Sequence, residues 1–440
     1  MREFLRRLRD DGDLALVERR VEAAFELAAV TQRIQATTNQ AVMFTHVAGT
    51  RLPVVSNVFG SRARLGAAIG VGDRGFPYAW DQIISGSVSR PEYPQDLSDH
   101  TIHGRLRDLP PLRYSRDDGG DYLTGGIFLA REPESGVANL SFHRAMYAGE
   151  AELRVRLAPG HHLAGYHAVA ERHGQDLDAA ILIGASPHLF LAAASRPGYG
   201  DSELDIAARL AGRPLRTRPG RTVELDIPLD ADIVIEGHFR PGVRRSEGPF
   251  GEFMGYYVDA GDNAVFEVTD VSWRGAAVFH SINCGSGEEA LPLGVLASAA
   301  TYRHLSERLP GIADVVRHPR VHHDVVALEQ LYDGHSTVVL RELMDTAGAK
   351  MCTVVDTDVD IYDLSDVLWA TLTRARPQAI LRRTPVRSFE HDPQVSWGRF
   401  GIDACAPYAE RHALRRTSIP GAERIDLADY VTDPSRAPLS

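Results

Sequence analysis

The chain has 440 residues, 44% hydrophobic and 24% charged, a composition typical of a globular protein rather than of a disordered or fibrous one. Its 59 acidic residues outnumber the 48 basic ones, and the net charge of −11 argues against a nucleic-acid-binding surface. A chain of this length exceeds one hydrophobic core, so about two or three domains are expected.

Neither a signal peptide nor a membrane span is predicted. The N-terminus, Met1–Arg9, begins an amphipathic helix and lacks the continuous apolar core of a signal peptide. The most apolar segment, Ala179–Ser195, is interrupted by Pro187 and His188 and is shorter than the roughly 20 residues that a bilayer span needs. The 3 cysteines are widely spaced and form neither a disulfide framework nor a zinc site. We therefore expect a cytoplasmic location.

Residues 1–105 alternate helical and strand-like patterns, which predicts an N-terminal α/β segment. The predicted helices and strands are Phe4–Arg9, Ala23–Ile34, Ala41–Val47 and Leu52–Asn57. A charged, Pro-rich stretch from Leu106 to Arg116 marks a plausible boundary after this segment.

Residues 106–307 are rich in strand patterns and poor in helices, apart from a helix predicted near His161–His173. The predicted strands are Gly126–Ala130, Asn139–Phe142, Glu152–Leu157, Ala179–Gly184, Thr222–Ile227, Ile233–Gly237, Ala264–Thr269 and Ala277–Ile282. This pattern indicates a barrel or a strongly twisted sheet.

In residues 308–440 the alternation of helix and strand returns, and the tail beyond Tyr430 is expected to fray. The predicted strands are Val325–Leu328, Ser336–Leu340 and Met351–Asp356. A helix is predicted over Leu364–Arg374, with Ser365 and Asp366 supporting its start.

The segment Glu247–Glu252 places two carboxylates five residues apart around a Gly-Pro turn. Both can therefore converge on one small volume, where the pKa of one acid is pushed up, as a carboxylic acid that delivers a proton near neutral pH requires. Ordinary surface charge is the alternative.

Further candidates precede this acid pair. Asn139 offers an amide oxygen for a hard cation and Arg144 a forked donor for a carboxylate or phosphate, although a turn cap and a surface ion pair explain them equally well. His161 and His162 point to different sides of a helix, so at most one joins a given site, and both can be solvated. Glu203 stands in a first helical turn, where the helix dipole favours a carboxylate whatever its function.

Asp356–Asp360 suggests a calcium loop, but Ile361 replaces the required Gly and Val367 replaces the bidentate Glu. No P-loop, dinucleotide-binding or nucleophile-elbow motif occurs. The sequence therefore does not predict a simple nucleotide-binding fold or an α/β-hydrolase fold.

The segments described above, in their order along the chain, resemble those of the UbiD family of decarboxylases, which use prenylated FMN. The resemblance runs nearly end to end, and its most specific parts are Glu247–Glu252 with the trailing Gly255–Tyr257 and, upstream, the spacing of Asn139 and Arg144. The other matching segments are Arg2–Leu8, Gly12–Leu14, Asn57–Arg62, Ala138–Met146, Ser202–Glu203, Ala211–Gly212, Ile235–Gly237, Val355–Asp360 and Val367–Thr371.

The resemblance implies a multidomain α+β and α/β fold. A central split β-barrel like that of flavin reductases would bind the flavin over residues 106–307. It would be flanked by an N-terminal α/β segment, 1–105, and a C-terminal α/β oligomerisation domain, 308–440. A homodimer or a higher homo-oligomer is expected.

The same resemblance implies prenylated FMN, supplied by a flavin prenyltransferase. A divalent metal, Mn²⁺ or Mg²⁺, would be held by Asn139, His162 and Glu203 and would bridge to the cofactor phosphate, with K⁺ nearby. The residues expected to bind the cofactor are Asn139, Ser141, Phe142, His143, Arg144, His161, His162 and Glu203.

The implied activity is a non-oxidative, reversible decarboxylation of an α,β-unsaturated or (hetero)aromatic carboxylic acid. Arg144 would orient the substrate carboxylate, Glu252 would donate the proton, and Glu247 would hold Arg144. The alternatives are a carboxylase working in the synthetic direction, a plain-FMN flavoprotein and a non-catalytic accessory subunit. A reductase needs a nicotinamide site and no paired acids, so the acid pair counts against that class.

The sequence also departs from the family pattern. Gly255 stands where some relatives carry a further acid, and Lys350 is a weak candidate for the lysine that binds the cofactor phosphate in some of them. Substrate selectivity is expected from loop residues such as Asn283 and the stretch 285–293, but the sequence leaves the acid itself undefined.

Overall fold

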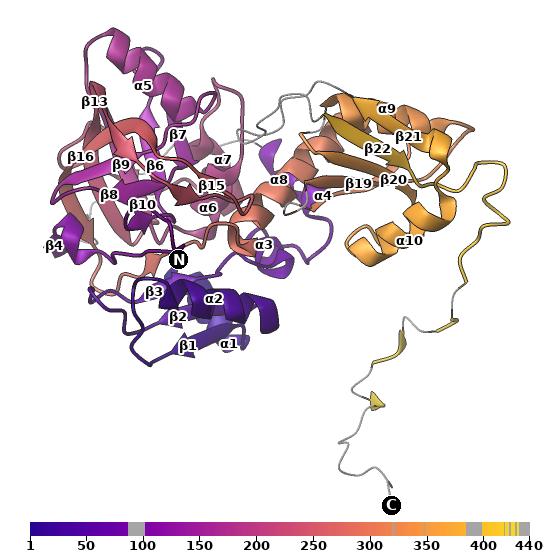
Figure 1. Cartoon of the computed structure of the whole chain (residues 1–440), viewed down its shortest axis with the longest axis horizontal. Helices are drawn as coiled ribbons and strands as arrows, with labels where there is room; N and C mark the ends of the chain where they lie inside the picture. Colours follow the sequence, from indigo (N-terminus) through magenta and orange to yellow (C-terminus); the bar gives the residue numbers. More distant parts are fainter. Residues whose placement is uncertain are drawn as a thin grey trace, which may run out of the picture.

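The computed structural model describes residues 1–86, 102–318, 320, 322–346, 348–383, 398–417, 419–421, 424–426 and 429–430. The predicted fraying tail beyond Tyr430 lies outside these ranges. An N-terminal α/β layer lies beside a curled central sheet, and the long helix α8 (Gly287–Ser306) leads to a separate C-terminal α/β domain (Figure 1). None of the helices in the described ranges combines the length and apolar character that a bilayer span requires.

The N-terminal layer contains a four-stranded sheet of order β1-β2-β3-β17. Its elements are α1 (Arg2–Asp10), β1 (Leu14–Val17), α2 (Glu26–Thr37), β2 (Ala41–Phe44), β3 (Val54–Ser56), α3 (Arg62–Ala68) and β17 (Phe279–His280). The next helix in the chain, α4 (Phe76–Ile84), packs against α8 instead. The last strand comes from far along the chain and pairs in parallel with β3. Our assignment of Ala277–Ile282 to the central sheet was therefore wrong, because an apolar run predicts a strand but not the partner of that strand.

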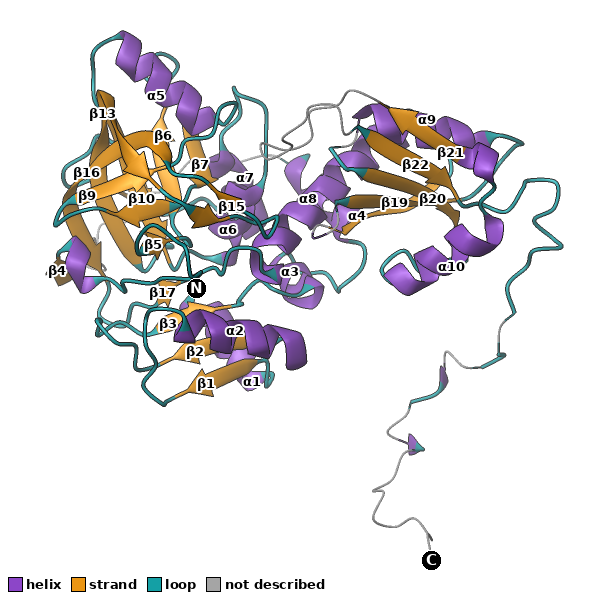
Figure 2. Cartoon of the chain, viewed as in Figure 1, coloured by secondary structure: helices purple, strands orange, loops and turns teal. Residues whose placement is uncertain are grey.

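The central sheet is antiparallel and curls into a half-barrel of order β5-β8-β9-β16-β13-β10-β6-β7, with β4 added beside β16 (Figure 2). Its strands are β4 (Ile102–Gly104), β5 (Tyr122–Leu123), β6 (Ile127–Arg131), β7 (Ala138–Phe142), β8 (Ala145–Tyr147), β9 (Glu152–Val155), β10 (Leu177–Ile183), β13 (Ile233–Glu247) and β16 (Gly261–Trp273). Two register shifts along the β13–β16 pair bend these long strands. The kinship with flavin reductases stays a prediction.

Short elements complete this part of the chain. They are η1 (Leu106–Asp108), α5 (His162–Arg172), α6 (Pro187–Ala194), α7 (Glu203–Ala211), β11 (Thr217–Pro219), β12 (Asp226–Pro228), β14 (Phe250–Gly251) and β15 (Tyr257–Val258). The prediction of a strand over Thr222–Ile227 was mostly wrong, because only its end lies in β12. Upstream, the buried Glu236 carboxylate accepts the backbone N–H groups of Arg221 and Thr222 at 2.7 and 2.8 Å, so these donors face a side chain rather than a neighbouring strand.

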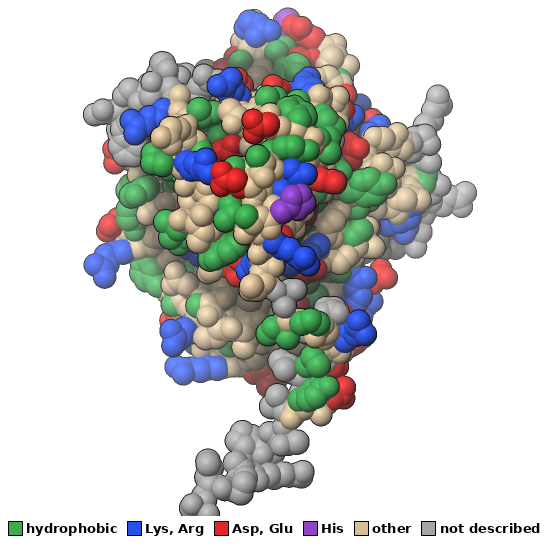
Figure 3. Space-filling view, turned by 90° about the vertical axis from the view of Figure 1, so that its right-hand side faces the viewer, with side chains coloured by type: hydrophobic (Ala, Val, Ile, Leu, Met, Phe, Trp, Pro, Cys, Tyr) green, Lys and Arg blue, Asp and Glu red, His purple; other side chains and the backbone are tan. Residues whose placement is uncertain are grey.

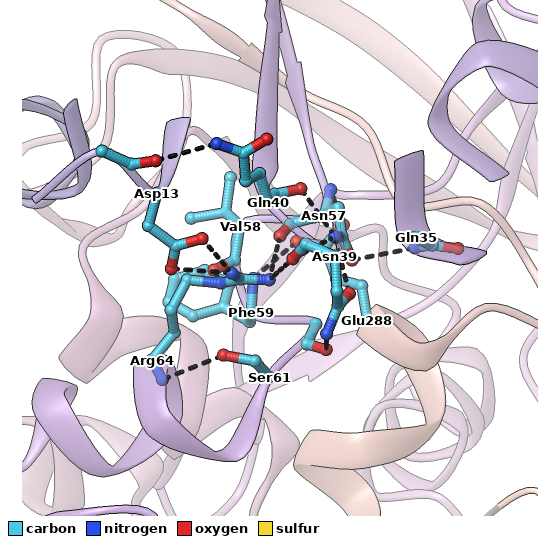
Figure 4. A network of polar contacts seen from close by, with 12 residues as sticks. Asp13, Gln35, Asn39, Gln40, Asn57, Val58, Phe59, Ser61, Arg64 and Glu288 are labelled. Atoms are coloured by element: carbon cyan, nitrogen blue, oxygen red, sulfur yellow. Dashed lines mark hydrogen bonds and ion pairs between the residues drawn. The ribbon is translucent and has the colours of Figure 1, made fainter. Parts of the chain in front are cut away.

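A buried polar network joins the N-terminal layer to the start of α8 (Figure 4). Arg64 donates to both carboxylate oxygens of Asp13 at 2.9 Å and to the carbonyl oxygen of Asn57 at 3.1 Å. Glu288 in the first turn of α8 accepts the backbone N–H groups of Asn57 and Phe59 at 2.5 and 3.0 Å. These bonds fix the first turn of α8 against the Asn57–Phe59 segment of the N-terminal layer.

The C-terminal domain has the sheet order β18-β19-β20-β22-β21, and Figure 1 shows α9 and α10 on opposite faces of this sheet. Its elements are β18 (Ile312–His318), β19 (His323–Leu328), α9 (His335–Thr346), β20 (Met351–Asp356), α10 (Leu364–Arg374), η3 (Pro377–Ala379), β21 (Ile380–Arg383) and β22 (Arg399–Asp403). The helix predicted over α10 is confirmed, although Asp363 caps it by accepting the Ser365 N–H.

The strand predicted over Ser336–Leu340 was wrong, since this segment lies in α9. Two β-branched valines suggested a strand, but the buried residues Val339, Leu340, Leu343 and Met344 recur at helical spacing. The rejected calcium loop serves a structural purpose, because Asp356 and Asp358 bind the buried guanidinium of Arg374 at 2.7–2.8 Å.

Candidate active site

The first site cluster centres on Arg144, which lies between β7 and β8. Its guanidinium forks onto Glu247, with Nε donating to Oε1 and Nη2 to Oε2, both at 3.0 Å. Nη1 donates to Oε1 of Glu252. The ring of Phe250 lies below the guanidinium, 4.8 Å from its central carbon. Burial acts to lower the pKa of Arg144, but the hydrogen bond and charge of Glu247, together with the charge of Glu252, raise it above its usual value.

Glu247 ends β13 and is fully buried. Besides Arg144, the Tyr122 hydroxyl donates to it at 2.8 Å and the Asn263 amide at 2.9 Å. Four donor contacts to its two oxygens suit a fixed carboxylate. The burial of Tyr122 and the charge of Glu247 raise the pKa of the phenol, so this hydroxyl stays a donor.

Glu252 follows β14, and its side chain is 19% exposed, so solvent protons reach it. The turn at Gly248, whose φ is +95°, brings Glu252 back toward the end of β13. The spacing predicted that both acids converge, and both reach the same guanidinium. The expectation that one of these two acids has a raised pKa stays a prediction.

The second site cluster centres on Glu203, the first residue of α7, which is buried. Its carboxylate accepts the Asn139 amide and the Leu140 backbone N–H, each at 3.0 Å. His162 Nδ1 lies 3.8 Å from Glu203 Oε1. Burial raises the pKa of Glu203 to about 7, and burial lowers the pKa of His162.

These side chains fit a divalent cation. The donor set suits Mn²⁺ or Mg²⁺. It consists of the buried carboxyl of Glu203, the neutral imidazole of His162 and the amide oxygen of Asn139. Of the three side chains, only His162 and Glu203 belong to the residue types His, Cys, Asp and Glu. Within the described ranges no group of three residues of these types could hold a metal ion.

The remaining predicted cofactor residues lie between the two clusters or beside them. The Ser141 hydroxyl donates to Asn139 Oδ1 at 2.9 Å and contacts His143 Nε2 at 3.0 Å. Burial, followed by the proximity of His161, lowers the pKa of His143 to about 3, so this ring is neutral. The His161 ring lies 5.7 Å from that of His143. Phe142 instead packs against Phe190 of α6, with ring centroids 5.0 Å apart.

Sequence reasoning missed two contributors to the first cluster and flagged a third only as part of a longer stretch. Tyr122 and Asn263 hold Glu247, but neither lies within a recognised motif, and no local pattern indicated either residue. The third, Glu289, falls inside the stretch 285–293 that was expected to shape selectivity. Burial, followed by the charge of Glu252, raises the pKa of Glu289 to about 8.

Other flagged positions have simpler surroundings. Asn283 is buried and donates to the carbonyl oxygen of Ala28 in α2 at 2.8 Å. Gly255 has φ +81° and closes a turn onto the carbonyl oxygen of Glu252, which explains why a glycine suits this position. Lys350 directly precedes β20 and donates its backbone N–H to His322 at 2.9 Å.

Three family models cover most of the chain. They describe the N-terminal, Rift-related and C-terminal domains of 3-octaprenyl-4-hydroxybenzoate carboxy-lyase, and they match residues 5–77, 89–287 and 291–404. Anhydromevalonate phosphate decarboxylase of Methanothermobacter thermautotrophicus is 28% identical over 95% of this chain and 99% of its own. An uncharacterised protein of the cooM 5′ region of Rhodospirillum rubrum is 31% identical over 97% of this chain and 95% of its own.

Solved structures agree with the family models. The UbiD-class enzyme HmfF from Pelotomaculum thermopropionicum, in complex with FMN, has a TM-score of 0.92 and 32% identity, covering 98% of this chain and 99% of its own. An evolved dimeric form of that enzyme, in complex with prenylated FMN, has a TM-score of 0.88 with the same identity and coverage. The likeness therefore spans all three parts of the molecule, and the chain belongs to the UbiD family of carboxy-lyases.

Proposed function

We propose that the chain removes CO₂ from an α,β-unsaturated or (hetero)aromatic carboxylic acid with prenylated FMN as cofactor. The observation that carries the proposal is the fork of Arg144 onto Glu247 together with its contact to Glu252. This arrangement places one cation and one water-accessible acid beside each other in a buried site. The cofactor, when bound, would stabilise the electron pair that CO₂ leaves behind on the substrate.

Arg144 carries five N–H donors, and three of them face carboxylates. A substrate carboxylate binds either the remaining donors of Nη1 and Nη2 or the position that Glu252 occupies on Nη1. Glu247 keeps its two bonds in either case, because it is also held by Tyr122 and Asn263. In the second case the substrate replaces Glu252 on Nη1, and in neither case does the guanidinium have to move.

Glu252 then acts as the proton donor. The bond between the substrate carbon and its carboxylate breaks, CO₂ leaves, and the electron pair stays with the substrate. A proton from the Glu252 carboxyl forms the new C–H bond, and the partly exposed carboxylate recovers its proton from water. The same steps in reverse describe carboxylation.

The function is tested with protein co-expressed with a flavin prenyltransferase and supplied with a panel of unsaturated and aromatic acids. We expect release of CO₂ from at least one acid and a prenylated flavin by mass spectrometry. Unmodified FMN that a nicotinamide reduces, with no CO₂ released from any acid, would favour the plain-FMN flavoprotein instead.

We also propose that Asn139, His162 and Glu203 would hold a divalent cation, Mn²⁺ or Mg²⁺, which would offset the negative charge of the cofactor phosphate. The supporting observation is the buried Glu203 carboxyl, which has no Lys or Arg partner among the described residues. The Asn139 amide nitrogen faces Glu203 and its oxygen accepts from Ser141, so the amide must reverse to present its oxygen to a cation.

Glu203→Gln is expected to weaken Mn²⁺ binding by about 100-fold or more, because the substitution removes the only charged ligand of the set. The measurement is calorimetry together with the flavin content of the purified protein. Asp205→Asn, on the exposed side of the same helix, is the matched control. Equal Mn²⁺ affinity in both variants would contradict the assignment.

A second copy of this chain is the proposed partner of the C-terminal domain. Leu364, Leu368 and Leu372 form a stripe along α10 and are 41%, 57% and 76% exposed. Figure 3 views the molecule from this side and shows hydrophobic side chains among the charged ones. Apolar side chains at a spacing of four on one helix suit helix packing between subunits.

Leu368→Glu combined with Leu372→Glu is expected to shift the protein to monomers in light scattering, because each buried carboxylate would lack a partner in the interface. Leu16→Glu is the control, because Leu16 in the N-terminal layer is about as exposed as Leu368. An unchanged mass for the double variant would rule out this surface.

A further inference from the structure

The loop between β17 and α8 places one carboxyl beside the acid pair without a role in the mechanism above. Glu289 lies in the first turn of α8, and its Oε2 accepts the Gly285 backbone N–H at 2.6 Å. A Cβ added at Gly285 would be 3.8 Å from the carbonyl oxygens of both Glu252 and Phe253. The loop that holds Glu289 therefore lies in contact with the turn that carries the proposed proton donor.

Glu288 and Glu289 are neighbours with different surroundings. Glu288 is fully buried and accepts from Asn57, Phe59 and His280, so its position is structural. Glu289 is half-buried, and its backbone N–H donates to the Ser286 hydroxyl at 3.4 Å. Among the described residues its carboxyl accepts one hydrogen bond, from the Gly285 N–H, and no ion pair holds it there. Its second oxygen is consequently available to a ligand.

The charges around Glu289 determine its protonation. Cys284, which lies in this loop, packs against the cluster of Tyr122, Met146 and Phe250 beside Arg144. Burial raises the pKa of Glu289 to about 8, the Gly285 N–H opposes this shift, and the charge of Glu252 on the adjacent turn adds to it. The carboxyl is thus mostly neutral at pH 7 and carries a proton that it can donate, whereas above about pH 8 it becomes an acceptor.

We propose that Glu289 recognises a polar group of the substrate other than the carboxylate that leaves, by donating a hydrogen bond to an uncharged acceptor. The substrate class is therefore a monocarboxylic acid that bears a neutral oxygen or nitrogen acceptor, and a second carboxylate is disfavoured. The reason is the local charge: Arg144 is already opposed by Glu247 and Glu252, so a second substrate anion would meet excess negative charge. This inference rests on the proposed function.

The test measures binding to cofactor-loaded protein by calorimetry, so it does not depend on turnover. The probes are benzoate and cinnamate, each unsubstituted, methoxy-substituted and carboxy-substituted at every ring position. We expect the best methoxy acid to bind about tenfold more tightly than its unsubstituted parent, and the carboxy acid to bind less tightly than the parent. Glu289→Ala should bring the methoxy preference to about onefold.

Glu289→Gln keeps a neutral donor of similar size, so it should retain the methoxy preference at about pH 6.5 and at about pH 9.5 alike. The wild type should show this preference at about pH 6.5 and lose it at about pH 9.5, because its carboxyl then loses the proton. Glu307→Ala, at the exposed end of α8, is the control and should behave as the wild type. A folded Glu289→Ala variant with an unchanged preference, or a wild type that prefers the dicarboxylic acids, would overturn the inference. Absence of CO₂ release with a Glu289-dependent preference would instead count against the proposed function alone.

Discussion

Arg144→Ala is expected to lower kcat/KM by about 1000-fold, because the variant loses both the donor for the substrate carboxylate and the contact to the proton donor. The free energy of unfolding should also fall, by about 3 kcal/mol, since Glu247 would remain buried without its cation. Steady-state kinetics and urea unfolding of cofactor-loaded protein measure the two effects separately.

Arg144→Lys separates charge from geometry. Lysine keeps the positive charge opposite Glu247 but cannot fork onto two carboxylates, so stability should largely return while kcat/KM stays low. Arg341→Ala removes an exposed arginine from α9 and should change neither quantity. Wild-type kinetics in a folded Arg144→Ala protein would show that this side chain has a structural role only.

Glu252→Gln is expected to lower kcat by about 100-fold to 10,000-fold, the range typical for loss of a positioned general acid. The amide has nearly the same shape, and its oxygen can still accept from Arg144, so cofactor content and stability should remain close to those of the wild type. The solvent deuterium isotope effect on turnover should change as well, because the protein no longer supplies the proton.

Glu267→Gln, on an exposed position of β16, is the matched control for that substitution. Equal turnover in Glu252→Gln and Glu267→Gln would assign the proton to another donor. Glu289 would then be the first to examine, because its carboxyl accepts from Gly285, which lies against this turn, and because burial raises its pKa to about 8.

Local patterns predicted most of the elements but not how they combine. The Asn139–Phe142 and Ala264–Thr269 runs were predicted as strands, and they lie in β7 and β16. The run Ala277–Ile282 has the same character but joins a different sheet, and Ser336–Leu340 lies in a helix. In both cases tertiary packing decided between structures that the local composition allows equally.

The site divides in the same way. The spacing within Glu247–Glu252 and the resemblance of Asn139–Arg144 to family motifs identified the two acids and the arginine as candidates. Neither could show that Tyr122 and Asn263, from two other strands, would both donate to Glu247. Such contacts depend on strand order, which a sequence does not state locally.

By itself, then, the sequence determined the family, the order of the α/β and β-rich parts and the identity of Arg144, Glu247 and Glu252 as candidates, because these depend on short-range spacing and local propensity. Only the tertiary structure decided that Glu247 is held by four donor contacts and that Glu252 stays open to water. It also brought Glu289, a third carboxyl, to the same region. The physical reason is that burial and charge depend on neighbours distant in the chain. Those neighbours are assembled only when the half-barrel curls and α8 docks against the N-terminal layer.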